Sequence, residues 1–207
     1  MLAVLLLCAG SPQLAVAAPM DPRPGIGRST AEPTGTALEL PVGLMSPERF
    51  AGYSEDHCRR DDDSRTDLEI GHGLNVQVCL SLINTTAQPI TLSLPAGLIF
   101  VSWDDETQNG LLITTETFEI PPGDEPFFVR LGLHCLNIGR SPSGLGDDFR
   151  LGPVTDDPLL HRLLERLDGH QLTDEDVMYV QNLVWNATDD ISLTPPDRAW
   201  LAALADR

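Results

Sequence analysis

Between residues 68 and 138 the sequence alternates between apolar and polar side chains, and this period of two is the feature that most limits the fold. The clearest run has its apolar side chains at every second position: Leu74, Val76, Val78, Leu80 and Leu82. Successive side chains of a β-strand point to opposite faces, so this run predicts a strand with one buried face. Further strand-like runs follow at 90–94, 98–103, 111–120 and 127–135, with turn residues between them. Five or more short strands at this spacing predict an antiparallel β-sandwich.

The C-terminal part of the chain has a helical pattern instead. Asp157-Pro158 is typical of a helix start, and the leucines that follow repeat at intervals of three and four up to Leu167. Thr173, with Asp176 three residues later, resembles a capping box and predicts the start of a second helix. Thr194-Pro195 predicts a short third helix. The expected fold class is therefore mainly β with α: an antiparallel β-sandwich followed by a C-terminal helical subdomain.

The first residues are typical of a targeting segment. Leu2–Leu7 form an apolar run, and Ala15-Val16-Ala17 offers an A-x-A cleavage site. These features predict a signal peptide at 1–18 and a secreted, extracellular protein. The apolar run is too short to cross a bilayer, so we expect a chain that does not span a membrane.

The remaining chain divides into three segments. Residues 19–48 are rich in Pro, Gly and Thr and have little apolar periodicity, so a linker or an extended arm is expected there. The β-sandwich is expected at 49–140, and the helical subdomain, packed on the sandwich, at 141–207. A Gly/Pro/Ser/Asp-rich stretch is expected to form a loop between the two, up to about Asp157.

Charge and composition exclude several classes of function. The chain has 13 Lys+Arg against 31 Asp+Glu, a net charge of −18, and such an acidic protein is not expected to bind nucleic acid. All its cations are arginines, which excludes P-loop phosphate binding and Schiff-base catalysis by lysine. Acidic loops such as Asp61-Asp62-Asp63 leave calcium binding open, but none matches an EF-hand loop. The histidines lack zinc-site spacing, and neither a metal nor a cofactor is expected.

The expected mature chain keeps three cysteines, an odd number for an oxidising compartment. Cys79 lies on the polar face of its strand, where a covering loop that carries Cys58 can reach it. A disulfide between them would close a loop of about twenty residues and contribute about 3 kcal/mol in the chain-entropy model. Cys135 then remains, on the apolar face at the end of the last strand. It is either a buried core thiol or a chemically modified one.

Gln181 is the unusual residue of the second expected helix. On a helical wheel it falls inside the apolar arc, between Val177 and Trp185. A buried carboxamide needs a partner, because an unmade buried hydrogen bond costs about 1–3 kcal/mol. From the wheel alone, we expect Gln181 to bond the backbone of a strand end or a loop.

Two short segments together resemble a known family, the bacterial surface thioester domains. The segments are His134-Cys135-Leu136-Asn137 and Val180-Gln181-Asn182-Leu183-Val184-Trp185, the latter followed by Thr188-Asp189. The family typically shows an aromatic–Cys pair and later Thr-Gln-x-Ala-Ile-Trp, often with Ser/Thr-Asp soon after. This chain departs from that pattern in that the Thr, the Ala and the aromatic residue are replaced by Val180, Leu183 and His134.

In that family the cysteine sulfur and the glutamine side-chain carbonyl form an internal thioester, with loss of ammonia. The thioester then acylates an amine or another nucleophile on a host surface or partner. The resemblance implies that Cys135 supplies the sulfur, that Gln181 supplies the acyl group, and that Trp185 shields the bond from water. A thioester needs both groups held together in a dry pocket, which a strand-end cysteine and a glutamine in an apolar arc can provide.

The resemblance implies a secreted bacterial module for surface binding or adhesion, attached covalently to a surface protein or an amine-bearing ligand. Such a bond is used once, so the protein would not be an enzyme. The first alternative is a non-covalent binding or structural module in which Cys135 and Gln181 are plain core residues. The second is a thiol-dependent enzyme, for which His134 is a poor base because adjacent strand residues point to opposite faces.

Overall fold

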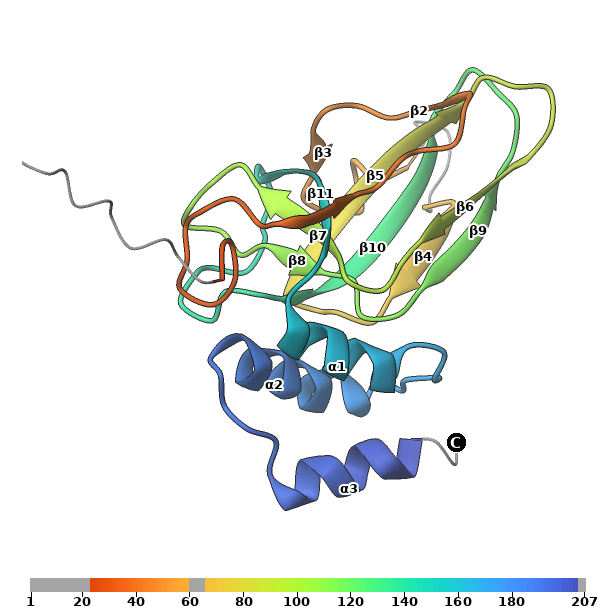
Figure 1. The fold of residues 1–207 in the computed structure, drawn as a ribbon. Coiled ribbons are helices and arrows are strands. Elements are labelled where there is room, and N and C mark those ends of the chain that lie inside the picture. Colours follow the sequence, from red (N-terminus) through yellow and green to blue (C-terminus); the bar gives the residue numbers. More distant parts are fainter. Residues whose placement is uncertain (1–22, 60–65, 205–207) are drawn as a thin grey trace, which may run out of the picture.

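The structure is a computed structural model that describes residues 23–59 and 66–204. The expected signal peptide at 1–18 lies outside the described residues. The described chain is a β-rich body with three helices at its C-terminal end, and Figure 1 shows the helices together on one side of the strands. The predicted fold class, mainly β with α and with C-terminal helices, is therefore confirmed.

Most of the strands belong to one curled sheet, whose order is β1-β11-β7-β8-β10-β5-β2, with β3 paired to β11 and β4 paired to β10. Its strands are β1 (Gly35–Ala37), β2 (Leu44–Met45), β3 (Phe50–Ala51), β4 (Leu68–Gly71), β5 (Val76–Asn84), β7 (Leu98–Ser102), β8 (Gly110–Leu111), β10 (Phe127–Cys135) and β11 (Asp148–Thr155). Its described pairs are antiparallel, except for β4 with β10. A separate antiparallel pair is formed by β6 (Ile90–Leu94) and β9 (Glu116–Ile120).

Two apolar cores lie on opposite faces of the curled sheet. The first, the sandwich core, is closed by the β6–β9 pair, which contributes Leu92 and Phe118. The second lies between the sheet and the helices. Strand β7 serves both, with Phe100 in the sandwich core and Ile99 in the helical one. This double burial explains why the sequence of β7 is apolar at consecutive positions rather than alternating.

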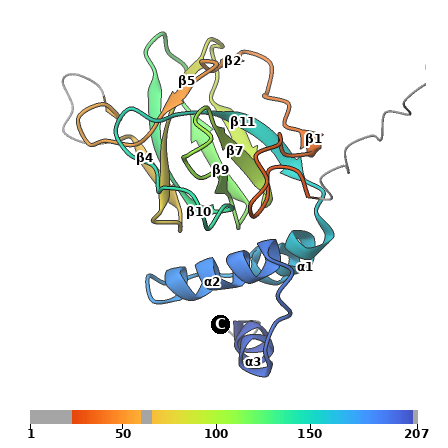
Figure 2. The ribbon, with the colours of Figure 1, turned by 90° about the vertical axis from the view of Figure 1, so that its left-hand side faces the viewer.

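The helices are α1 (Pro158–Leu167), α2 (Asp176–Thr188) and α3 (Pro195–Leu204). Figure 2 shows α1 and α2 next to the sheet, with α3 beyond them. Asp157 caps α1 as predicted, since its side chain accepts the backbone N–H groups of Leu159 and Leu160. Arg23 ties this cap to the end of α2, with bonds of 2.7 Å to the Asp157 carboxylate and 2.8 Å to the carbonyl of Thr188.

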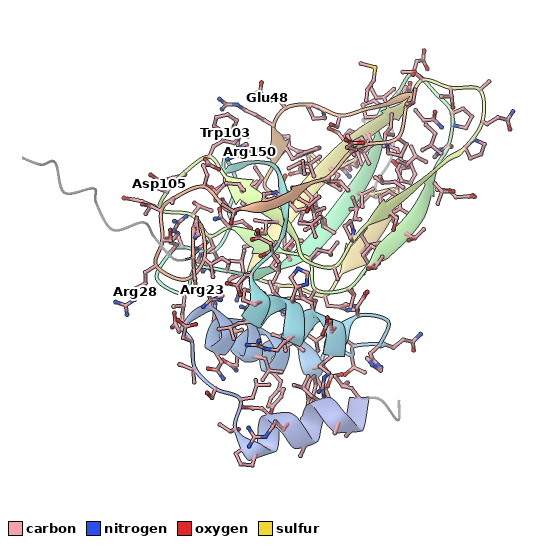
Figure 3. All side chains as sticks on the ribbon, in the orientation of Figure 1. Arg23, Arg28, Glu48, Trp103, Asp105 and Arg150 are labelled. Carbon is pink, nitrogen blue, oxygen red and sulfur yellow. A yellow bond between two sulfur atoms is a disulfide. The ribbon has the colours of Figure 1, made fainter. Side chains whose placement is uncertain are left out.

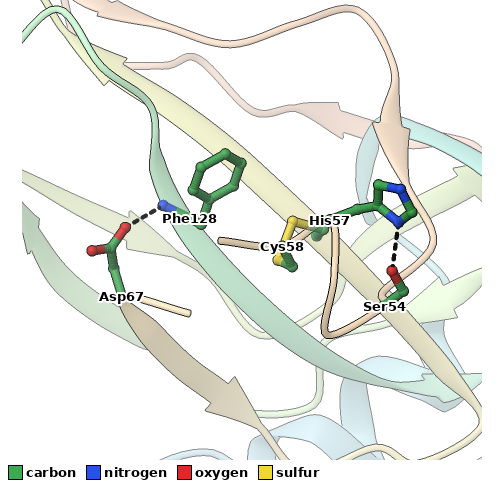
Figure 4. The surroundings of a disulfide bond; sticks show 6 residues. Ser54, His57, Cys58, Asp67 and Phe128 are labelled. Carbon is green, nitrogen blue, oxygen red and sulfur yellow. Dashed lines mark hydrogen bonds between the residues drawn. A yellow bond between two sulfur atoms is a disulfide. The ribbon is translucent and has the colours of Figure 1, made fainter. Parts of the chain in front are cut away.

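The predicted disulfide between Cys58 and Cys79 is confirmed (Figure 4). Both cysteines are buried, and the bridge holds the loop after β3 against the middle of β5. In the same region the Asp67 carboxylate accepts the backbone N–H of Phe128, and Ser54 is hydrogen-bonded to His57. The loop that carries Cys58 is thus joined to the sheet by a covalent bond.

The loop expected up to about Asp157 contains a strand instead. Strand β11 pairs with β7 on one side and with β1 and β3 on the other. The prediction was wrong because Gly152 and Pro153, which are typical of turns, lie inside this strand at an irregularity in its pairing with β7. Gly152 is required by close packing, since a Cβ atom there would lie 2.8 Å from the carbonyl oxygen of Ile99.

Of the two expectations for residues 19–48, the described part from residue 23 onward has the form of an arm that packs along the sheet. It contributes β1 and β2, and Ile26 is buried in the helical core. Its backbone is also held by the loop after β10, because the Asn137 side chain donates to the carbonyls of Gly25 and Gly27 at 3.1 Å each.

Candidate functional site

The end of β10 and the middle of α2 bring Cys135 and Gln181 together, although they are 46 residues apart. The backbone N–H of Cys135 donates to Gln181 Oε1 at 2.9 Å, and Gln181 Nε2 donates to the carbonyl of Cys135 at 3.0 Å. Both residues are buried, at 0% and 2% exposure. The pair of bonds joins the helix to the strand end inside the protein.

The pattern of strand pairing explains why a side chain is needed there. Successive backbone groups of a strand point to alternate sides, and the N–H of Leu136 donates to Asn109 on the β8 side. The N–H and C=O of Cys135 therefore point to the opposite side, where the pairing of β10 with β5 has ended at Leu133. The Gln181 carboxamide takes the place of the missing strand and satisfies both groups.

The expectation that Gln181 bonds the backbone of a strand end is confirmed by these contacts. They also orient the amide, because its oxygen faces an N–H donor and its nitrogen faces a carbonyl acceptor. Cys135 is the free cysteine of the described chain, and its side chain belongs to the sandwich core. The thioester between the two residues stays a prediction.

Burial dominates the chemistry of the Cys135 thiol. It raises the pKa of the thiol to about 12, against a smaller opposing effect of a hydrogen bond with Asn75. The thiol is therefore protonated at neutral pH and shielded from water. A thiol in this state is a poor thiolate nucleophile, but its surroundings would protect an acyl group on the sulfur from hydrolysis.

Trp185 lies one helical turn after Gln181 and packs against the sandwich core, the cluster to which Cys135 belongs. Its indole Nε1 is buried and has no hydrogen-bond partner within the described chain. The position agrees with a cover over the strand end, and the shielding role of Trp185 remains a prediction.

His134 is the residue of this site that the sequence interpretation undervalued. It is 1% exposed, and within the described chain neither ring nitrogen has a hydrogen-bond partner. The pKa of His134 is lowered to about 4, mainly by burial and also by the charge of His72, against an opposing interaction with the Gln181 side chain. His134 does face away from the side chain of Cys135, but it faces Gln181. The alternating pattern of β10 shows that His134 lies on the face opposite Cys135. The sequence of the strand does not show which helix packs on that face.

A surface pocket of about 470 Å³, here named the β10–α2 pocket, is lined by residues of β10 and of the start of α2. The residues that line it and matter here are Glu69, His72, Arg130, Gly132, Asp174 and Val177. Arg130 and Gly132 precede His134 on the same face of β10. Val177 precedes Gln181 by one helical turn. The pocket therefore lies on the same face of β10 as His134 and on the same side of α2 as Gln181, although neither residue lines it.

His72 is held against the end of β10 by close packing of its neighbour. A Cβ atom on Gly73 would lie 1.8 Å from the carbonyl oxygen of Leu133, so only glycine fits there. His72 itself is partly exposed, and it lines a second pocket of about 370 Å³ on its other side. This histidine is thus partly exposed to solvent and interacts electrostatically with the buried ring of His134.

Other chemistry-bearing groups in the described chain do not form a comparable site. Among residues 23–59 and 66–204, no three His, Cys, Asp or Glu side chains lie together in a way that could hold a metal ion. Trp103, on the surface in Figure 3, is covered by the chain's own Arg49, 4.2 Å from the ring centre, with Arg150 at 5.9 Å. In the described part of the chain, no helix is both long and apolar enough for a membrane span.

Comparison of the chain with models of protein families, with curated proteins and with solved structures finds no match. The description of Cys135, Gln181 and His134 therefore rests on the structure of this chain alone.

Proposed function

We propose that this protein is a secreted surface-binding module that attaches covalently to its partner through a thioester between Cys135 and Gln181. The observation that carries the proposal is the pair of hydrogen bonds, 2.9 and 3.0 Å long, between the Gln181 carboxamide and the backbone of Cys135. They hold the amide group next to the free cysteine of the described chain. Preorganisation of this kind is what an internal acyl transfer requires.

The bond would form in one balanced step. Cys135 Sγ attacks Gln181 Cδ, the Sγ–Cδ bond forms, the Cδ–Nε2 bond breaks, and the thiol proton leaves with the nitrogen as ammonia. Negative charge develops on Oε1 in this step, and the Cys135 N–H already donates to that oxygen at 2.9 Å. A backbone donor in a dry site is the usual device for stabilising such an oxyanion.

Release of the acyl group would attach the protein to its target. An amine on a surface protein or ligand attacks Cδ, an amide bond forms, and Cys135 is regenerated as a thiol. Each molecule reacts once, so this is a coupling reaction rather than catalytic turnover. The disulfide supports the secreted location, because such bonds persist in oxidising compartments.

The test is the intact mass of the mature chain before and after incubation with methylamine. The proposal expects a native mass lower than calculated by one ammonia, and then addition of methylamine at Gln181. Cys135→Ala and Gln181→Ala should each abolish both effects. Cys58→Ala/Cys79→Ala, which removes the disulfide elsewhere in the sheet, should keep them. A native mass without this loss, together with alkylation of Cys135 in the unfolded chain, would overturn the proposal.

One observation favours a second candidate, a non-covalent binding module. Both polar atoms of the Gln181 carboxamide are satisfied by backbone groups, so a purely structural role accounts for its burial. The same mass measurement separates the two candidates, because the non-covalent module keeps its full mass.

A further inference from the structure

His134 carries an energetic cost that its packing does not explain. Its ring is 1% exposed, and neither of its nitrogens finds a hydrogen-bond partner within the described chain. An unsatisfied buried polar group costs about 1–3 kcal/mol, and a phenyl ring of similar size would avoid that cost. Buried polar groups kept without a partner are characteristic of sites where a ligand or a proton completes the bonding.

Two features relate the ring of His134 to the carboxamide of Gln181: their interaction, and the β10–α2 pocket on the same face of β10. The Gln181 side chain lies close enough to influence the pKa of His134, and the ring is neutral at physiological pH because burial lowers that pKa to about 4. The β10–α2 pocket is lined by Arg130 and Gly132, which precede His134 on the same face of β10. The Cys135 side chain lies on the opposite face, in the sandwich core.

We infer that a nucleophile reaches Gln181 through the β10–α2 pocket and that His134 accepts the proton that this nucleophile loses. The inference rests on the proposed function. In the step, the amine nitrogen bonds to Cδ from the outer face and the Cδ–Sγ bond breaks toward the sandwich core. The amine N–H proton passes to the neutral imidazole and Sγ leaves as a thiolate on the sandwich-core face. The imidazolium then gives its proton to solvent, and the sulfur takes one from solvent and becomes a thiol. His134 is thereby restored to its starting form.

The pocket has the charge that such a nucleophile needs. Glu69 and Asp174 lie on its wall and attract a protonated amine to its mouth, where the amine loses a proton to solvent and becomes nucleophilic before it attacks. Glu69 is paired with Arg130 at 3.1 Å, which leaves Asp174, exposed in the turn before α2, as the carboxylate at the rim. His72, partly exposed and beside the buried ring, lies where a proton can be exchanged with solvent.

The experiment compares the rate of methylamine incorporation, followed by intact mass, in four mature proteins: the natural chain, His134→Phe, His134→Gln and the control His57→Phe. His57 is an exposed histidine next to the disulfide and does not line the pocket. Thermal unfolding shows that each variant is folded. Loss of a general base slows a reaction by about 100-fold or more, so both His134 variants should couple at least that much more slowly, with His57→Phe unchanged.

Two outcomes overturn the inference, and they are distinguishable. If the natural chain has its full mass, both the proposed function and the role of His134 fall. If the natural chain carries the thioester and either His134 variant couples within threefold of its rate, the proposed function stands and the role of His134 is refuted. For the route, Asp174→Trp should slow a bulky lysine derivative more than methylamine, and an equal effect on both would refute entry through the pocket.

Discussion

Replacing Gln181 with methionine measures what the carboxamide contributes to the fold, apart from any reaction. The measurement uses a Cys135→Ala background, which cannot form a thioester but keeps the backbone groups that Gln181 binds. Methionine keeps the length and approximate volume of the side chain, so packing changes little. What is lost is the partner of the N–H and of the C=O at residue 135.

The magnitude follows from these two groups. Each lies in a buried contact, and a buried backbone group without a partner costs about 1–3 kcal/mol. The Gln181→Met change should therefore lower the free energy of unfolding by about 2–6 kcal/mol. With a urea m-value of about 2 kcal/mol/M, the unfolding midpoint should fall by about 1–3 M. Tryptophan fluorescence, with the disulfide intact, follows the transition.

The Gln181→Glu change, made in the same Cys135→Ala background, tests the two hydrogen bonds through the pH dependence of stability. A protonated carboxyl can accept from the N–H and donate to the C=O of residue 135, whereas a carboxylate cannot donate. Burial should raise the folded-state pKa of this carboxyl above the unfolded value of about 4.3. Its stabilising contribution is then fully present below about pH 4.3 and is lost as the pH rises through the folded-state value.

The matched reference is the Cys135→Ala protein, unfolded at each pH. If the free energy of unfolding of Gln181→Met lies within about 0.5 kcal/mol of this reference, the two hydrogen bonds do not hold α2 to β10, and the account of the site is wrong. The same conclusion follows if the difference in free energy of unfolding between Gln181→Glu and the reference does not become smaller as the pH is lowered.

Two further predictions concern the frame of the site. Removing the disulfide with Cys58→Ala/Cys79→Ala should lower the free energy of unfolding by about 3 kcal/mol in the chain-entropy model, since the bridge spans 21 residues. A urea unfolding midpoint equal to that of the natural chain would contradict this prediction. Asp157→Ala should cost about 1–2 kcal/mol at pH 7 through loss of the α1 cap. Burial works to raise the pKa of Asp157, but Arg23 and the backbone N–H groups of the cap outweigh it and hold the pKa low. The stabilisation is therefore present above about pH 4 and lost below it, and a difference between the two proteins that stays constant from pH 7 to pH 3 would refute this account.

The sequence predicted the strands correctly where one face of the strand is buried along its whole length and the apolar residues therefore alternate. The range predicted for the last sandwich strand, 127–135, is the range of β10, because one of its faces lies in the sandwich core throughout. The start of β5 was predicted too early, since Leu74 is 58% exposed and the strand begins at Val76. An isolated apolar residue next to a strand extends the alternation without being buried, and periodicity cannot tell the two cases apart.

The residues of strand β11 do not predict a strand. Its Gly152-Pro153 pair is a turn signal, yet Pro153 lies opposite Ala37 of β1, and the glycine allows close packing against β7. Both residues are tolerated because β11 carries an irregularity there. Such a strand forms because of its pairing with neighbouring strands, and its own sequence does not predict it.

The sequence by itself determined which side of each element is apolar, where α1 begins, and that Cys58 and Cys79 can pair, because these follow from local periodicity, capping and loop length. It also marked Cys135 and Gln181 as residues that need an explanation. Only the tertiary structure decided that the two meet, and that the ring of His134 is buried with no hydrogen-bond partner for its nitrogens within the described chain. The physical reason is that a strand's sequence encodes which face is buried, whereas the element that buries it, and the polar atoms that element brings, come from a distant part of the chain.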